Sequence, residues 1–142
     1  MAKGNTFSQA LLKLIFQAVN ITSIADNTTS SPLTNLYVSL HTANPGPSGD
    51  QTTSEAAYGS YTRIPVARTT GGFSISNQSI SPVSTIVFPL ATSGSETETY
   101  YAIGTDPTGP GTLLYSGTIL PTILVNSGVT PQLSAGSTIT ET

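Results

Sequence analysis

The sequence predicts a mainly β protein: a two-sheet jelly roll or related β-sandwich of about eight short strands with one N-terminal amphipathic helix. Only 8% of the 142 residues are charged, against roughly 25% in ordinary globular domains. Threonine, valine, isoleucine and tyrosine, which favour strands, are frequent instead. Ten prolines and thirteen glycines supply the turns that short strands need. A chain of this length can bury a hydrophobic core without metal or crosslinks.

Residues 6–19 form the one segment with clear helical periodicity. Thr6 can cap the first turn, because its side-chain oxygen can accept a backbone N–H. The apolar side chains cover an arc of roughly 200°, wider than the usual stripe of about 100°. Either the helix lies deep in its own domain, or it lies between its own sheet and a neighbouring subunit. The arc consists of Phe7, Leu11, Leu12, Leu14, Ile15, Phe16, Ala18 and Val19.

Residues 20–34 are a polar connector with too few apolar residues to pack as an element. The connector could serve as an arm that reaches a partner. The predicted organisation is therefore an N-terminal helix and connecting arm over residues 1–34, followed by a jelly-roll β-sandwich domain over residues 35–142.

The segment 35–68 reads as a strand, a long polar loop and a second strand. In residues 35–41, apolar and polar side chains alternate with the period of two that a half-buried strand needs. Residues 44–47, Asn-Pro-Gly-Pro, end the strand because proline has no N–H to give to a ladder. An extended chain resumes at 61–66, where Pro65 indicates a sheet edge or a bulge.

Six further extended segments follow at short intervals, separated by glycine and proline turns. Their unequal loops favour a jelly roll over an up-and-down barrel, whose hairpins are more regular. The sequence shows no internal repeat and no heptad run, which argues against a fibrous shaft or a coiled-coil stalk. The segments are residues 72–76, 85–88, 99–103, 112–116, 118–120 and 137–140.

The charge and hydropathy patterns argue against nucleic acids and membranes as partners. The net charge is −3, and all four cations precede residue 69, so no basic nucleic-acid-binding surface is present. The apolar run 10–19 is interrupted by Lys13 and Gln17 and is too short to span a membrane. It also lacks the cleavage site of a secretory signal. We therefore expect neither a nucleic acid nor a membrane as partner.

Few residues could carry chemistry. His41 is the single histidine, and a Ser-His-Asp arrangement could recruit Asp50 or Glu55, but no Gly-x-Ser-x-Gly motif accompanies it. Glu96 and Glu98 could give oxygen ligands to calcium, as could Asp106, yet their spacing matches no ion-binding loop. We expect no catalytic residue, metal or cofactor, and we expect Glu96 and Glu98 on a solvated strand edge.

Two neighbouring segments carry a resemblance to a known class of proteins. Residues 40–46, Leu-His-Thr-Ala-Asn-Pro-Gly, and residues 58–66, Tyr-Gly-Ser-Tyr-Thr-Arg-Ile-Pro-Val, resemble small virion proteins of tailed bacteriophages. The chain looks most like the jelly-roll head cement, or decoration, proteins. In the proteins it resembles, the position of His41 belongs to the same strand-to-loop segment, which implies a hydrogen-bonded structural role for this histidine. The resemblance also implies a non-enzymatic homodimer on the outer surface of the phage head. There it would bridge subunits of the major capsid protein and stabilise the shell.

Two alternatives remain open. Related segments also occur in tail-fibre proteins, so the chain could be a tail-fibre or baseplate module that binds a host surface receptor through the 42–60 loop. It could instead be an enzyme acting on surface glycans, a reaction that requires two positioned carboxylates. In this chain Glu96 and Glu98 come closest to such a pair.

Candidate interface residues come from the helix and from the long loop. Tyrosine and arginine are enriched at interaction hot spots, and large apolar side chains of a wide helical arc can pack on a partner. The alternative is that Tyr58 and Tyr61 fix the loop to its own sheet. The candidates are Phe7, Leu11, Leu12, Phe16, Tyr58, Tyr61, Arg63 and Arg68.

Overall fold

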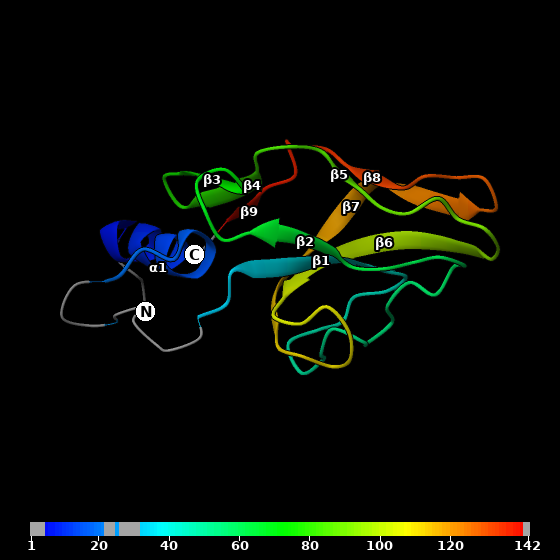
Figure 1. Ribbon diagram of the computed structural model, residues 1–142, viewed down its shortest axis with the longest axis horizontal. Helices are drawn as coiled ribbons and strands as arrows, with labels where there is room; N and C mark the ends of the chain where they lie inside the picture. Colours follow the sequence, from blue (N-terminus) through cyan, green and yellow to red (C-terminus); the bar gives the residue numbers. More distant parts are fainter. Residues whose placement is uncertain (1–4, 22–24, 26–31, 141–142) are drawn as a thin grey trace. The chain divides into compact units, whose positions relative to one another are not determined.

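The computed structural model describes residues 5–21, 25 and 32–140, and in that part of the chain it contains one helix and nine strands (Figure 1). The strands form three sheets, with the orders β2-β1-β6-β7, β3-β4-β9 and β5-β8. The structure confirms the predicted mainly β class with one helix, and it is consistent with a β-sandwich. The elements are α1 (Asn5–Gln17), β1 (Asn35–His41), β2 (Ile64–Ala67), β3 (Phe73–Ser76), β4 (Ser79–Pro82), β5 (Ile86–Val87), β6 (Ser95–Gly104), β7 (Leu113–Asn126), β8 (Gln132–Leu133) and β9 (Ile139–Thr140).

The described residues fall into two compact units. The first unit takes its residues from Met1–Asn35, Val66–Thr85 and Ser134–Thr142, and the second consists of Leu36–Pro65 and Ile86–Leu133. The predicted boundary after residue 34 lies close to the first change of unit. The strands β3, β4 and β9 belong to the same unit as the helix, however, so the helix does not form a unit by itself. Whether residues 35–142 fold independently stays a prediction.

In the first unit, α1 packs on the hairpin of β3 and β4 (Figure 1). The buried face of the helix is a narrow row of Ser8, Leu12 and Phe16 at a spacing of four residues. The Phe16 ring meets Phe73 of β3 edge to face, with 5.0 Å between the ring centroids. This row buries only part of the predicted apolar arc, since the Phe7 side chain remains 42% exposed.

The helix ends two residues earlier than the predicted 6–19 span. Ala18 adopts a left-handed backbone with φ of 55°, a conformation that terminates helices. The Val19 N–H then donates to Lys13 O, which satisfies one of the carbonyls left free at the helix end. Val19 itself is 47% exposed.

In the second unit, β1 pairs antiparallel with β6, and β6 pairs antiparallel with β7. The predicted 35–41 bounds of β1 are confirmed. Leu36, Val38 and Leu40 are buried on one face, but Ser39 and His41 on the other face are buried as well, so β1 is not the half-buried strand predicted from the alternation. The 64–67 bounds of β2 begin later than the predicted 61, and β2 is an edge strand, as Pro65 indicates. The connection between the paired strands β1 and β6 is long, because β2 to β5 lie between them in the sequence.

The strand β7 corrects two predictions. One 14-residue strand replaces the two short ones predicted at 112–116 and 118–120. It runs through Gly117 because the Tyr101 ring lies over that position, where an added Cβ would come 2.9 Å from the ring. Further along, Thr118 pairs with Tyr100 and Ile123 pairs with Glu98. Residues 119–122 of β7 therefore lie opposite only residue 99 of β6, which makes a large bulge.

Candidate functional site

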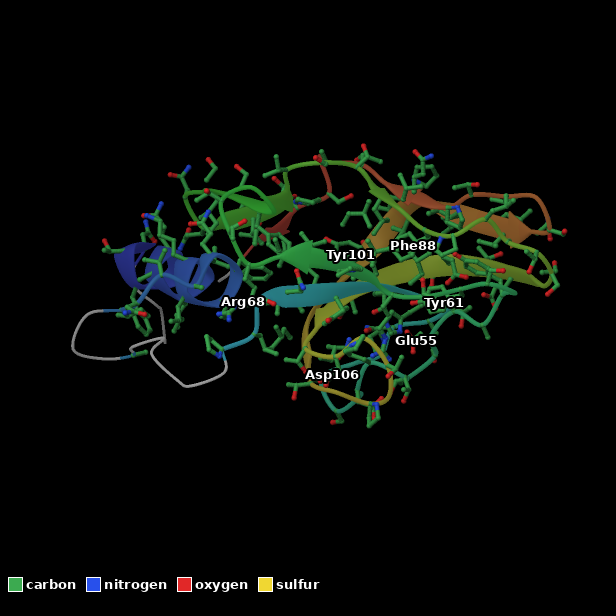
Figure 2. The ribbon with its side chains drawn as sticks, viewed as in Figure 1. Glu55, Tyr61, Arg68, Phe88, Tyr101 and Asp106 are labelled. Atoms are coloured by element: carbon green, nitrogen blue, oxygen red, sulfur yellow. The ribbon has the colours of Figure 1, made fainter. Side chains whose placement is uncertain are left out.

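A polar cluster of the second unit centres on an ion pair in the long loop. The Arg63 guanidinium binds Glu55 through two contacts, Nε to Oε1 at 2.6 Å and Nη2 to Oε2 at 2.8 Å. Arg63 is only 7% exposed. The Tyr61 hydroxyl donates to Glu55 Oε1 at 3.1 Å and accepts the Leu40 N–H at 3.1 Å. Tyr61 thus joins the ion pair to β1, and Figure 2 labels Glu55 and Tyr61 in this region.

The same arginine connects the 42–60 loop to the loop between β6 and β7. Its Nη1 donates to Asp106 O at 2.9 Å and its Nη2 to Gly109 O at 2.7 Å. Gln51, which is fully buried, exchanges two hydrogen bonds with the backbone of Asp106. An added Cβ at Gly104 would lie 2.1 Å from the Gln51 side chain, so only glycine fits there. These hydrogen bonds join the 42–60 loop and the 105–111 loop into one structure, called here the loop clamp.

Electrostatics keep the Arg63 guanidinium charged and the Tyr61 hydroxyl protonated. The hydrogen bonds that Arg63 donates to the Glu55 carboxylate raise the pKa of Arg63 above its ordinary value. Burial raises the pKa of Tyr61, and the neighbouring Glu55 carboxylate raises it further, so the hydroxyl stays protonated as a donor. Beside the ion pair the Tyr61 ring stacks on Phe88 at 6.3 Å and meets Tyr58 edge to face at 5.3 Å.

An open hollow of about 230 Å³ lies at the surface of the clamp. Its charged groups, Glu55 and Arg63, already bind each other and the loop backbone, so they are not available to a ligand ion. The hollow offers a ligand the hydroxyls and backbone of its exposed rim. Its lining consists of Glu55, Tyr61, Thr62, Arg63, Pro107, Thr108 and Gly109.

His41 has the structural role predicted from the sequence. Its Nδ1 lies 2.8 Å from Thr53 O and its Nε2 lies 2.8 Å from Ser39 Oγ. Because a carbonyl oxygen only accepts, the hydrogen of the neutral ring sits on Nδ1, and Nε2 accepts the Ser39 hydroxyl. Burial lowers the pKa of His41. In a catalytic triad, Asp50 or Glu55 would bind Nδ1 of His41. Here Nδ1 binds the Thr53 carbonyl instead.

The predicted solvated edge at Glu96 and Glu98 is wrong. The side chain of Glu98 is 0% exposed, and neither carboxyl oxygen has a hydrogen-bond partner among the described residues. Burial, and then the nearby Glu96 carboxylate, raise the pKa of Glu98 to about 8. Glu96 is only partly exposed, and its Oε1 accepts the N–H groups of Ala57 and Tyr58 at 2.8 and 2.9 Å. At pH 7 the folded protein therefore favours the neutral carboxylic acid form of Glu98.

Most candidate interface residues make contacts inside their own units. Leu12, Phe16, Tyr58 and Arg63 are buried, whereas Phe7 is exposed. Leu11, Tyr61 and Arg68 are partly exposed. The structure confirms the alternative that Tyr58 and Tyr61 fix the loop, because the Tyr58 hydroxyl also donates to Pro89 O at 3.1 Å. An interface role for the accessible candidates stays a prediction.

Arg68 has a role that sequence reasoning missed. In the first unit its guanidinium donates to Ile15 O at 2.6 Å, Leu14 O at 2.8 Å and Leu33 O at 2.7 Å. Two of these acceptors are carbonyls of the last helical turn, where a cation also complements the helix dipole. Arg68 therefore caps the C-terminus of α1, a contact that no local sequence signal indicates.

Two exposed leucines of β7 were also missed. Leu120 is 86% exposed and Leu124 is 59% exposed, the two highest values among the large apolar side chains of the described residues. One feature of the sequence marks the region around these leucines: residues 107–140 contain no Asp, Glu, Lys, Arg or His.

Within the described residues, no group of three or more His, Asp or Glu side chains lies close enough to hold a metal ion. The helix in the same part of the chain is too short and insufficiently apolar to cross a membrane.

Comparison with known proteins identifies the family of the chain. A search of curated proteins found no match. A family model described as podophage GP4 fiber I protein gp80 matches residues 3–141. The match supports the predicted phage virion structural protein, and its description names a fibre rather than a head cement protein. Because it covers almost the whole chain, this protein belongs to the podophage GP4 fiber I protein gp80 family and is a structural protein of a phage virion.

Proposed function

We propose that the protein is a fibre subunit of the virion and binds a host surface molecule without chemical turnover. The observation that carries this proposal is the family match over residues 3–141, whose description is a fibre protein. The family match favours the tail-fibre hypothesis over the head cement hypothesis. The resemblance of residues 40–46 and 58–66 is compatible with both.

The loop clamp supports a binding role. A loop that is already fixed in its bound shape loses less conformational entropy when a ligand binds. In this protein the buried Arg63 and Gln51 hold the 42–60 loop and the 105–111 loop in one arrangement. The clamp therefore presents a preformed, almost uncharged rim of threonine, proline and glycine residues. Such a rim suits a polar neutral ligand, such as a surface glycan, better than an ion.

Competition for adsorption tests the proposal. Purified protein should slow adsorption of the phage to host cells in a dose-dependent manner. Thr108→Arg places a bulky charge on the exposed rim and should remove the competition, whereas Ser84→Arg, at an exposed position of the first unit, should leave it intact. Equal competition by both variants would exclude the clamp as the binding surface. Absence of competition by the unaltered protein would contradict receptor binding.

The absence of turnover has its own test. Host surface polysaccharide incubated with the protein should release no reducing ends. If it does, Glu96→Gln and Glu98→Gln variants would show whether the carboxylate pair is responsible. Release that depends on either glutamate would replace the binding role with a hydrolytic one.

A further inference from the structure

Glu98 of β6 is a buried titratable group that the proposed receptor binding does not use. Its side chain is 0% exposed, and neither carboxyl oxygen has a hydrogen-bond partner among the described residues. Glutamate is almost never fully buried without a partner, because its charged form loses the hydration that it has in water. Glu96 lies two residues earlier on β6, so both side chains leave the strand on the same face. Their partner residues on β7, Ile123 and Val125, are apolar and cannot balance a negative charge.

Glu96 joins this face of β6 to the long loop. Its Oε1 accepts the N–H groups of Ala57 and Tyr58 at 2.8 and 2.9 Å. The Tyr58 ring in turn meets the Tyr61 ring edge to face, and the Tyr61 hydroxyl donates to Glu55 of the ion pair. The hydrogen bonds of Glu96 therefore support the aromatic and ionic contacts of the loop clamp.

The residues on either side of Ala57 and Tyr58 are held by other groups. The Ala56 N–H donates to Leu40 O at 2.8 Å, and the Gly59 N–H donates to Ser93 O at 2.9 Å. These two backbone hydrogen bonds do not involve Glu96. A change at Glu96 is therefore expected to free the two residues between these anchors and to leave the anchors in place.

We propose that loss of the Glu98 proton releases Ala57 and Tyr58 from Glu96 and so loosens the loop clamp. A charged Glu98 would lie beside the Glu96 carboxylate in a site without access to water, where like charges repel strongly. Two movements relieve this repulsion: Glu96 turns toward solvent, or the loop lifts and admits water. Both movements break the hydrogen bonds from Ala57 and Tyr58 to Glu96.

The transition falls in the mildly alkaline range. Burial, and then the Glu96 carboxylate, raise the pKa of Glu98 to about 8. The ionised fraction of Glu98 therefore rises from about one tenth at pH 7 to about nine tenths at pH 9. Tyr58 is the ionisable group that faces Glu98 from the loop, and burial raises its pKa to about 12, so it stays neutral over this range. The clamp is thus ordered at neutral pH and loosened in alkaline medium.

Amide hydrogen exchange of the purified full chain at pH 7 and pH 9, measured by NMR, tests the proposal. Rates are expressed as protection factors, which remove the intrinsic pH dependence of exchange. The protection factors of Ala57 and Tyr58 should fall about tenfold, in proportion to the ionised fraction of Glu98. Those of Ala56 and Gly59 should not change, because their N–H groups bind backbone carbonyls. An equal fall at all four residues, or no fall at Ala57 and Tyr58, would overturn the proposal.

Glu98→Gln is the matched variant, since glutamine has nearly the same shape and cannot ionise. Its protection factors at Ala57 and Tyr58 should be the same at both pH values. In the wild type, the NMR shift of the Glu98 carboxyl carbon should titrate with the same midpoint as the exchange at Tyr58. Different midpoints, or a fall in the glutamine variant equal to that of the wild type, would overturn the proposal. Neither result bears on receptor binding or on the fibre assignment, because both experiments use the purified chain without host cells or virions.

Discussion

Replacing Glu98 by glutamine should stabilise the protein at neutral and alkaline pH. Folding places this carboxyl in a fully buried site where neither oxygen has a described partner and where its pKa rises from 4.5 to about 8. In the unfolded chain the group ionises near its ordinary value. Folding at pH 7 therefore requires the carboxyl to take up a proton, and this uptake has a free-energy cost.

The size of the effect follows from the two pKa values. The folded value lies above the unfolded one, so the folded state binds more protons between them and stability falls as pH rises from about 4.5 to about 8. At pH 7 the unfolded carboxyl lies about 2.5 pH units above its pKa, which corresponds to a cost of about 3 kcal/mol. Glutamine avoids this cost but leaves amide groups unpaired at about 1 kcal/mol. The expected net gain at pH 7 is about 2 kcal/mol.

Urea unfolding of wild type and Glu98→Gln at pH 5 and pH 8 measures this effect. The difference between the two proteins should be small at pH 5 and should grow by a few kcal/mol at pH 8. Glu96→Gln is the control: this carboxylate accepts two backbone N–H groups, so its loss should destabilise the protein at both pH values. An unchanged difference between pH 5 and pH 8 would refute the assignment of a buried, neutral Glu98.

Three further predictions concern other parts of the structure. Arg63→Met should destabilise the second unit by about 3–5 kcal/mol, because it leaves the Glu55 carboxylate without its buried partner. A decrease in the free energy of unfolding below about 1 kcal/mol, measured with denaturant, would show that solvent replaces the arginine. Since the pKa of His41 is lowered by folding, its contribution to stability should be complete above about pH 6.5 and should be lost as pH falls below that value. This decrease in stability with falling pH should be clearest in the Glu98→Gln variant. A Glu98→Gln variant whose stability does not change between pH 7 and pH 5 would contradict the prediction. Ala18→Gly should increase the free energy of unfolding by about 1 kcal/mol and so raise the thermal midpoint, because Ala18 adopts a left-handed backbone with φ of 55°. A lower thermal midpoint would argue against that conformation.

The parts of the fold with local signals could be predicted from the sequence. The β1 strand shows strict alternation, and the helix shows a repeat of apolar residues, so the sequence indicates both directly. The Ser79–Pro82 strand was missed because it contains one apolar residue before a proline. The single long β7 was missed because Gly117 and Pro121 read as breaks, and only the Tyr101 ring and the bulge explain how the strand continues.

The candidate site depended on contacts between distant residues. Glu55 and Arg63 are eight residues apart in an irregular loop, and their joint contact with the 105–111 loop has no sequence signature. For Glu98, like charges at alternate strand positions suggested a solvated edge. In the structure β6 begins at Ser95 instead of the predicted 99, which places both glutamates within the paired strand, where Glu98 is buried.

Gold-labelled antibody against this protein, bound to purified virions, tests the central claim most directly. The fibre assignment predicts label at a few sites on the tail fibres and none on the shell of the head. Label distributed over the whole head surface would contradict it and would favour the capsid cement role.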